Sequence, residues 1–390
     1  MVDIHNYKRR LEQILARLER ESISSANKKY IKEFSQFCIA NGIGAGKVQR
    51  YISDLIILAR WLKKDYKRCN RKDIEFVILK LEQSHYSEWT KYGFKIGLRK
   101  FFTWLKNSDE YPEEVKWIKM RLKNNKGKLP EDLVTEDEVK RMILATKHSR
   151  DKALIAVLYE SGCRIQEVLT LRIKHIFFDQ YGSIITVSGK TGSRRVRLVF
   201  AVPYLQEWLN NHINHKDPES FVWLGRKNKL IGYASIRKLL KTIAKNADIK
   251  KKVNPHNFRH ARASYLANYL TESQLKEVFG WAQASRMASV YVHLSGKNTD
   301  QAILKVYGKT LEIETDKANL IPKTCPRCQT ENEATHKYCK LCGTILDEEE
   351  RTKLIANQSS KSEIDKFMNL LIKDKDVIEL LTKKIKEVKL

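Results

Sequence analysis

The chain has 390 residues, and 42% of them are hydrophobic, which excludes a disordered chain and suggests two or three domains. Lys and Arg number 74 against 46 Asp and Glu, so the formal net charge is +28. Such an excess predicts a polyanionic partner, with nucleic acid as the first candidate and an anionic membrane surface as the second. No stretch is long and apolar enough for a transmembrane span, and the N-terminus has no apolar signal region. We therefore expect a soluble protein in the cytoplasm.

Residues 1–108 predict a domain made of helices. Apolar residues recur at helical spacing in five segments, and three of these begin at a residue that can cap a helix: Ser24 or Ser25, Asn70 and Ser87. The polar faces are rich in Lys and Arg, for example over residues 91–100. Such a face is in general only solvated, but in so basic a chain we interpret it as a surface that follows DNA phosphates.

Residues 131–312 predict a second helical domain with a small antiparallel sheet. A linker over residues 109–130 precedes it, with two prolines, an Asn-Asn-Lys-Gly-Lys run and little periodicity. Thr135 and Glu138 form a capping-box pattern before an apolar helix, and the next apolar helix ends at Gly162. Three short runs predict strands, and a glycine-bearing hairpin turn joins the last two; the runs are residues 176–178, 183–187 and 196–200.

The clearest chemical signal lies in residues 254–295. Asn254 can cap a helix, and Pro255 suits the first helical position, where no backbone donor is needed. His256 and Arg259 are three residues apart, so they project from the same face near the start of that helix. A helix N-terminus that carries these two side chains favours the binding of an anion.

Other polar residues lie at positions that are ambiguous when each is taken alone. Trp281 follows the apolar helix that ends at a glycine, and Tyr291 comes ten residues later in an amphipathic run. Arg164 and Glu167 are three apart on a short helix, so Glu167 either holds Arg164 or is an ordinary solvated carboxylate. Lys190 sits at the tip of the hairpin turn, where a lysine is usually only solvated.

Taken together, these pieces resemble the tyrosine recombinase (phage integrase) family over roughly residues 135–308. The pieces follow the family's order, namely Gly162-Cys-Arg-Ile-Gln-Glu167, Lys190, His256-Asn-Phe-Arg-His260, Gly280-Trp281 and Tyr291-Val-His293. The interval of ten residues from Trp281 to Tyr291 is one longer than in bacterial and phage members and resembles that of archaeal integrases. The helical N-terminal region resembles the family's core-binding domain. The family implies a mainly α fold with a small antiparallel sheet in the catalytic domain.

The resemblance implies a site-specific recombinase or integrase that cleaves and rejoins DNA through a 3'-phosphotyrosine intermediate. Tyr291 would attack the phosphorus, and Arg164 and Arg259 would hold non-bridging oxygens and stabilise the developing charge. Lys190 would protonate the leaving 5'-oxygen. Neither ATP nor a catalytic metal would be needed, because the covalent link conserves the bond energy and no clustered carboxylates are present.

The remaining family positions have supporting roles. His256 would accept or relay the tyrosine proton and contact the phosphate. Trp281 would donate its indole N–H to a phosphate oxygen or pack against the tyrosine helix. Glu167 and His260 would support the residues that touch the DNA. The implied partners are double-stranded DNA and further copies of the chain, assembled as a tetramer on DNA, without a membrane.

Four cysteines in two C-x-x-C pairs predict a zinc ribbon over residues 313–346; they are Cys325, Cys328, Cys339 and Cys342. Four thiolates leave no open position for water, so the zinc would be structural. His336 is a possible ligand only if one cysteine is free. Residues 347–390 predict a tail with an amphipathic helix, which packs either on its own domain or, as the resemblance implies, on a neighbouring subunit.

Two other functions fit part of the pattern. A type IB-like DNA topoisomerase would use the same residues to relax supercoiled DNA. A non-catalytic zinc-ribbon protein would bind DNA without cleaving it. The separate helical domain and the tail favour a recombinase over the first, and the full set of polar residues favours it over the second. An archaeal mobile-element integrase is the specific form that we expect, and a host resolvase stays an alternative.

Overall fold

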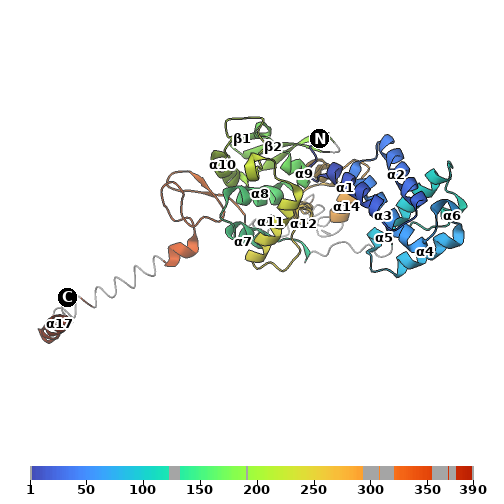
Figure 1. Ribbon diagram of the computed structural model, residues 1–390. Coiled ribbons are helices and arrows are strands. Elements are labelled where there is room, and N and C mark those ends of the chain that lie inside the picture. Colours follow the sequence, from blue (N-terminus) through green and yellow to red (C-terminus); the bar gives the residue numbers. More distant parts are fainter. Residues whose placement is uncertain are drawn as a thin grey trace. The chain divides into compact units, whose positions relative to one another are not determined.

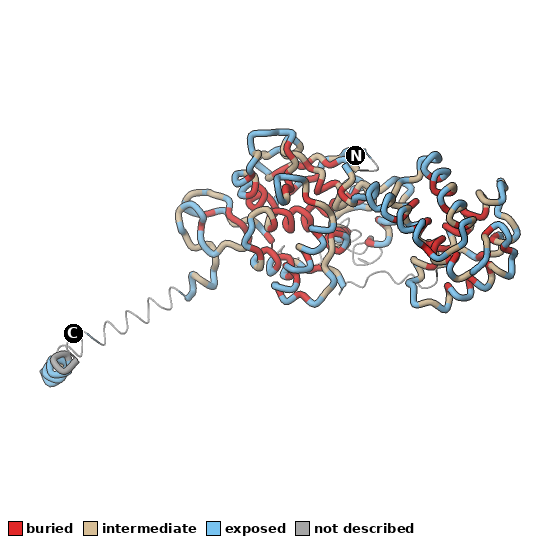
Figure 2. The backbone as a smooth tube through the Cα atoms, in the orientation of Figure 1, coloured by how far each residue is buried: buried red, intermediate tan, exposed pale blue. Residues whose placement is uncertain are grey.

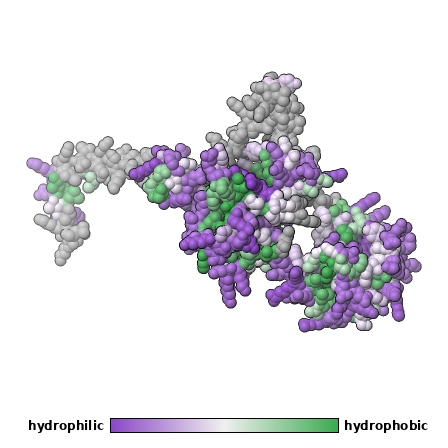
Figure 3. All heavy atoms as spheres, turned by 90° about the horizontal axis from the view of Figure 1, so that it is seen from above, coloured by the Kyte–Doolittle hydropathy of each residue, from purple (hydrophilic) through white to green (hydrophobic). Residues whose placement is uncertain are grey.

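The computed structural model describes residues 2–122, 132–189, 192–292, 307, 320–353, 368 and 375–388 (Figure 1). The chain divides into two compact units. The first comprises Met1–Pro130 with Gly232–Ala234, and the second comprises Glu131–Ile231 with Ser235–Leu390. Among the described helices, none has the length and apolar character needed to cross a membrane. Hydrophilic residues cover most of the described surface in the view of Figure 3.

The first unit is built of helices, as the sequence predicts. Its elements are α1 (Tyr7–Arg20), α2 (Ser25–Ala40), α3 (Ala45–Leu62), α4 (Arg71–Gln83), α5 (Glu88–Leu105) and α6 (Glu113–Lys116). Ser24, Asn70 and Ser87 each accept a backbone N–H at the start of a helix, so the predicted caps are confirmed. The fully buried rings of Phe34, Tyr66 and Phe101 pack edge to face in the core.

The second unit is built around one buried helix, α8 (Ser149–Ser161). Almost every residue of α8 is buried, and it contacts α7, α10, α12 and β3 (Figures 1 and 2). The other helices of this region are α7 (Glu136–Leu144), α9 (Ile165–Leu169), α10 (Val202–Asn210), α11 (Tyr233–Asn246), α12 (Pro255–Leu266), α13 (Glu272–Phe279) and α14 (Met287–Val292). An apolar helix without a polar face therefore forms the centre to which the site-bearing elements attach.

A three-stranded antiparallel sheet packs on one side of this centre. Its strands are β1 (Ile176–Asp179), β2 (Gly182–Gly189) and β3 (Gly192–Leu198), in the order β1-β2-β3. Ile185 pairs with Val196, and both side chains are buried. Successive side chains alternate between the two faces, so Arg194 and Leu198 lie on the same inward face as Val196. The predicted fold class, mainly helical with a small antiparallel sheet, is confirmed.

The C-terminal part of the second unit contains a small cysteine-bearing segment. It includes the two-residue strands β4 (Lys323–Thr324) and β5 (Glu331–Asn332), which pair antiparallel. The tail helix α17 (Lys375–Val388) carries exposed apolar residues, among them Leu380. Most of the residues between this segment and α17 lie outside the described part of the chain, so both predicted docking modes of the tail stay predictions.

A buried carboxylate ties the end of the sheet to the central helix. Glu160, near the end of α8, accepts the backbone N–H groups of the three residues that follow β3. The distances are 2.8 Å from Val199, 3.0 Å from Phe200 and 2.8 Å from Ala201. Hydrogen bonds from neutral donors to a carboxylate are stronger than those between two neutral groups. This contact fixes where β3 ends and where α10 begins.

We expect Glu160→Gln to destabilise the second unit. The amide keeps the shape of the side chain but has one acceptor oxygen, so at least one buried N–H loses its partner, at a cost of about 2–3 kcal/mol. Calorimetry of the full chain measures the change as a lower Tm. Glu219→Gln is the matched control, because Glu219 is exposed and surface ion pairs such as those it forms with Arg172 and Lys174 contribute little to stability. Equal Tm shifts for the two variants would contradict this account.

Candidate active site

Arg259 lies near the start of α12 and is almost completely buried, with 5% of its surface exposed. Its Nη1 donates to the carbonyl oxygen of Gly162 at 3.0 Å, and its Nη2 donates to that of Phe279 at 2.7 Å. The guanidinium also lies over the rings of Phe279 and Trp281. Burial, and then the nearby charge of Arg164, lower the pKa of Arg259 to about 10. The side chain therefore stays positively charged at neutral pH.

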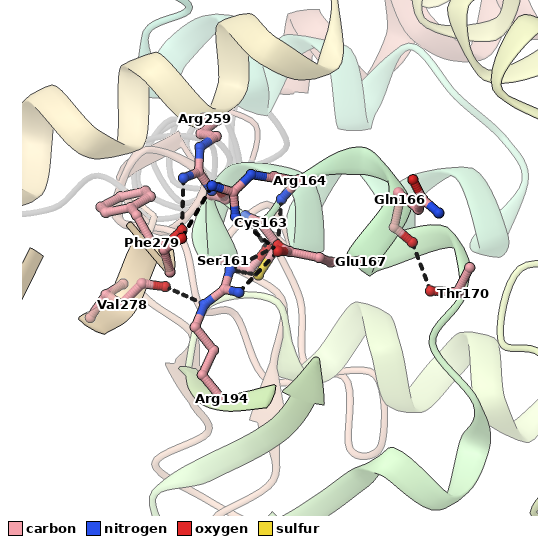
Figure 4. Close-up of polar contacts among 12 residues, drawn as sticks. Ser161, Cys163, Arg164, Gln166, Glu167, Thr170, Arg194, Arg259, Val278 and Phe279 are labelled. Carbon is pink, nitrogen blue, oxygen red and sulfur yellow. Dashed lines mark hydrogen bonds and ion pairs between the residues drawn. The ribbon is translucent and has the colours of Figure 1, made fainter. Parts of the chain in front are cut away.

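Arg164 lies directly before α9, after a left-handed turn at Gly162. Its Nη2 donates to the carbonyl oxygen of Gly280 at 3.1 Å. Gly280 directly follows Phe279, whose carbonyl oxygen accepts a hydrogen bond from Arg259. The two guanidiniums therefore lie side by side, as the sequence-based hypothesis requires (Figure 4). The Arg164 side chain is 36% exposed, so this member of the pair remains open to solvent.

Glu167 holds Arg164, which decides between the two interpretations that the sequence left open. Its Oε2 accepts the backbone N–H of Arg164 at 2.8 Å, and its Oε1 accepts Nη1 at 3.1 Å. A second arginine, Arg194 on β3, donates to the same carboxylate (Figure 4). Burial alone would raise the pKa of Glu167, but the contacts with Arg194 and Arg164 outweigh it, and the pKa lies below its ordinary value. Glu167 is therefore a buried anion.

Sequence reasoning missed Arg194. The predicted strand began at Val196, whereas β3 begins at Gly192 and includes Arg194. The alternation of buried residues at 196 and 198 would have placed Arg194 on the inward face, had the strand been extended. That signal was present in the sequence.

Three positions around these side chains are glycines, and a larger residue at any of them would collide with the site. A Cβ atom at Gly280 would lie 2.7 Å from Nη1 of Arg194. A Cβ atom at Gly189 would overlap the carboxylate of Glu167, and one at Gly162 would overlap the ring of Phe279. Gly162 and Gly280 also have positive φ angles, +55° and +57°, which other residues rarely adopt. The backbone at these three positions lies close to Arg194, Glu167 and Phe279 because glycine has no side chain.

Tyr291 on α14 is 7% exposed and lies close enough to Arg259 for the charge of the guanidinium to act on it. Its hydroxyl is hydrogen-bonded to Nδ1 of His260, and its ring stacks on Trp281, with centroids 5.7 Å apart and an interplanar angle of 4°. Trp281 thus packs against the tyrosine helix, which is one of the two roles that we weighed for it. Burial raises the pKa of Tyr291, while the charge of Arg259 acts in the opposite direction. The phenol is therefore neutral at pH 7.

The remaining predicted residues are distributed as follows. His256 lies one turn before His260 on α12, and the two imidazole rings are 5.3 Å apart. The structure therefore brings together Arg164, Arg259, His256, Trp281 and Tyr291, with Glu167 and His260 in direct contact with members of the group. Lys190 and His293 lie outside the described residues. The strands on either side of Lys190 pair through Gly189 and Gly192.

The four cysteines of the C-x-x-C pairs also converge. The sulfur atoms of Cys325, Cys328, Cys339 and Cys342 all lie within 4.8 Å of one another. The Sγ atoms of Cys325 and Cys342 are 3.5 Å apart, as are those of Cys328 and Cys339. Zn–S bonds of about 2.3 Å in a tetrahedron separate the sulfurs by about 3.8 Å, so the donor set fits a zinc ion. Nε2 of His336 lies 3.3 Å from the Glu333 carboxylate, and His336 does not belong to the described cluster.

Comparisons with known proteins match the part of the chain that carries these residues. Residues 132–298 match the Phage integrase family. A tyrosine recombinase of Thermosipho africanus is 29% identical over 272 residues, which cover 66% of this chain and 92% of that protein. Tyrosine recombinase XerA of Pyrococcus furiosus is 26% identical over 282 residues, which cover 70% of this chain and 92% of XerA.

Two solved structures share the fold. The XerH site-specific recombinase, in a pre-cleavage complex with its difH substrate, matches with a TM-score of 0.55 at 18% identity, over 77% of this chain and 96% of that chain. A lambda integrase dimer bound to a COC' core site matches with a TM-score of 0.55 at 13% identity, over 67% of this chain and 76% of that chain. By its family match over residues 132–298, its relatives and its fold, the chain carries a phage integrase domain and is a tyrosine-type site-specific DNA recombinase.

Proposed function

We propose that the chain cleaves and rejoins DNA by attack of Tyr291 on a backbone phosphorus. The observation that carries this proposal is the convergence of Arg164 and Arg259 beside the buried Tyr291 hydroxyl. A guanidinium presents a planar fork of N–H donors, which suits the non-bridging oxygens of a phosphate and the charge that grows on them in the transition state. The proposal therefore assigns charge stabilisation to arginines, without ATP or a catalytic metal.

The bonds and protons balance within this set. The Tyr291 oxygen forms a bond to phosphorus, and the bond from phosphorus to the 5'-oxygen breaks, which leaves a 3'-phosphotyrosine and a free 5'-hydroxyl. A neutral phenol must lose its proton as it attacks, and His260, which is hydrogen-bonded to the hydroxyl, is placed to take it, with His256 one turn away. Lys190 protonates the leaving 5'-oxygen. Rejoining reverses each step.

The substrate of this reaction is double-stranded DNA. The net charge of +28 supports a polyanionic substrate, and the XerH and lambda integrase structures were solved with DNA sites bound. Residues 1–108 act as a core-binding domain joined by a linker over 109–130 to the catalytic domain over 131–312. Copies of the chain assemble as a tetramer on two DNA sites in the cytoplasm. The XerA relatives from Pyrococcus species support an archaeal type of tyrosine recombinase. An integrase of an archaeal mobile element is the form that we propose, with a host resolvase as the alternative.

The cysteine segment over 313–346 is a structural zinc ribbon in this proposal. The four converging sulfurs support a closed site that has no position for a reacting water. Similar turns present the two cysteine pairs: the amides of Gln329 and Gly343 donate to the carbonyls of Cys325 and Cys339, and both turn residues have positive φ angles. Bound zinc would add the stability that so small a segment lacks. The tail over 347–390 follows the ribbon.

We expect Tyr291→Phe to bind DNA without forming a covalent complex. Because the target site is unknown, the probe is a library of duplexes with a randomised centre and a nick, from which a short 5'-hydroxyl strand can diffuse away. Denaturing electrophoresis separates the covalent complexes, and sequencing identifies the trapped duplex. Tyr269→Phe is the matched control, because Tyr269 is an exposed tyrosine at the end of α12, and it should trap DNA like the wild type. A covalent complex of Tyr291→Phe would reject the assignment.

We expect one zinc ion per chain, measured by atomic emission after purification without added metal. Cys339→Ser should lose this zinc and lower the Tm, because it removes one of four thiolates. Cys69→Ser changes a buried cysteine of the first unit and should keep the zinc. The folded fraction of the Cys339→Ser variant should cleave DNA at a rate less than about tenfold below that of the wild type, because the ribbon takes no part in the chemical step. Full zinc retention, or complete loss of cleavage, would contradict this assignment.

A further inference from the structure

The buried arginine on β3 has no role in the mechanism above, yet it contacts the residues that hold Arg164. We infer that Arg194 is a positioning residue for DNA cleavage, which fixes Glu167 and the turn before Trp281 so that both anchors of Arg164 stay in place. This inference rests on the proposed function. It adds a residue that acts through Glu167 and does not touch the DNA.

Arg194 occupies a position where the sheet otherwise buries apolar side chains. It lies opposite Val187, on the same inward face as Val196 and Leu198, and its side chain is only 9% exposed. A buried guanidinium costs several kcal/mol of desolvation unless it is paired and hydrogen-bonded. The chain therefore places a costly charge where valine or isoleucine would satisfy the sheet, which calls for an explanation beyond packing.

The donors of Arg194 are directed at two separate segments. Nη1 and Nη2 donate to the two carboxylate oxygens of Glu167 at 3.0 and 2.8 Å, as a planar fork. Nε donates to the carbonyl oxygen of Val278 at 2.8 Å, and Nη2 also lies 3.4 Å from the sulfur of Cys163 (Figure 4). A single side chain thus joins β3 to α9 and to the end of α13.

Each of these segments carries one anchor of Arg164. Glu167 accepts Nη1 and the backbone N–H of Arg164, and the Arg194 fork prevents the carboxylate from turning away. The carbonyl of Gly280, two residues after Val278, accepts Nη2 of Arg164. A side chain at position 280 would collide with Arg194, so the glycine at this position leaves room for the guanidinium. Arg194 is therefore the common support of both contacts that orient the half-exposed Arg164.

Without this fork, Glu167 would keep Arg164 as its remaining described ion-pair partner and could rotate with it. A displacement of about 1 Å in a phosphate-binding group can lower a rate by about 100-fold. Arg194 itself cannot supply that contact, because it is buried and its donors are directed at protein atoms. The expected defect is therefore that of a misplaced Arg164, with the charge of Arg164 retained.

The test compares Arg194→Gln with the wild type on the duplex recovered from the randomised library. We expect cleavage, measured as the single-turnover rate of covalent complex formation, to fall by about 10–100-fold, while DNA affinity changes less than about twofold. Arg197→Gln is the control on the same strand, because Arg197 pairs with Asp179 at the surface, and it should cleave like the wild type. Calorimetry verifies that each variant is folded.

A second substrate distinguishes positioning from general support of the fold. A methylphosphonate at the scissile position has no negative charge, so it depends less on a correctly placed arginine. We expect the deficit of Arg194→Gln to shrink to less than about threefold on this substrate. An equal deficit on both substrates, or a loss of cleavage that follows a loss of folded protein, would overturn the inference. If Arg194→Gln does not fold, Arg194→Lys retains the charge without the fork, and the same comparison between substrates decides.

The two failures are distinguishable. If the wild type forms no covalent complex with any duplex of the library, the proposed function is wrong. If the wild type forms the complex and Arg194→Gln forms it at the same rate, the proposed function stands and the role of Arg194 is wrong.

Discussion

The site depends on one buried carboxylate that two arginines share. Glu167 lies at the start of a five-residue helix, where it accepts N–H groups from Arg164 and Arg194. A carboxylate at 2% exposure is stable as an anion only with such partners, and its charge in turn lowers the cost of burying the guanidinium of Arg194. Removing any of the three groups leaves a buried charge without a full set of contacts. The orientation of the partly exposed Arg164 therefore depends on Glu167 and, through Glu167, on Arg194.

The fold supplies backbone carbonyls as well as charges. Gly162, Phe279 and Gly280 each direct a carbonyl oxygen at Arg164 or Arg259. These carbonyls come from the ends of α8 and α13, where a helix leaves its last acceptors without intrahelical partners. The buried α8 fixes one of these ends, and the Glu160 contact fixes the strand that carries Arg194. Apolar packing thus determines the position of a polar site.

Much of this site can be predicted from the sequence, because helical spacing and helix caps are local properties. The cap at Asn254 and the spacing of His256 and Arg259 determine their common face. Which histidine meets the Tyr291 hydroxyl could not be predicted, because it depends on how α14 packs against α12. Arg194 was missed for a different reason, namely that the predicted strand began at Val196, whereas β3 begins at Gly192. The pairing of Arg194 with Val187 in β2 extends the strand beyond the apolar run that the prediction relied on.

The glycines around the carboxylate have a consequence for how such proteins can change over time. Gly162 and Gly280 end the helices α8 and α13, and Gly189 is the last residue of β2. A single added methyl group at any of them would displace a charged or aromatic neighbour. The side chains of the site fill the space that these glycines leave, so a substitution at a glycine requires a compensating change in its neighbour. Selection for a new target sequence should therefore change other surfaces of the protein, and leave these three codons unaltered.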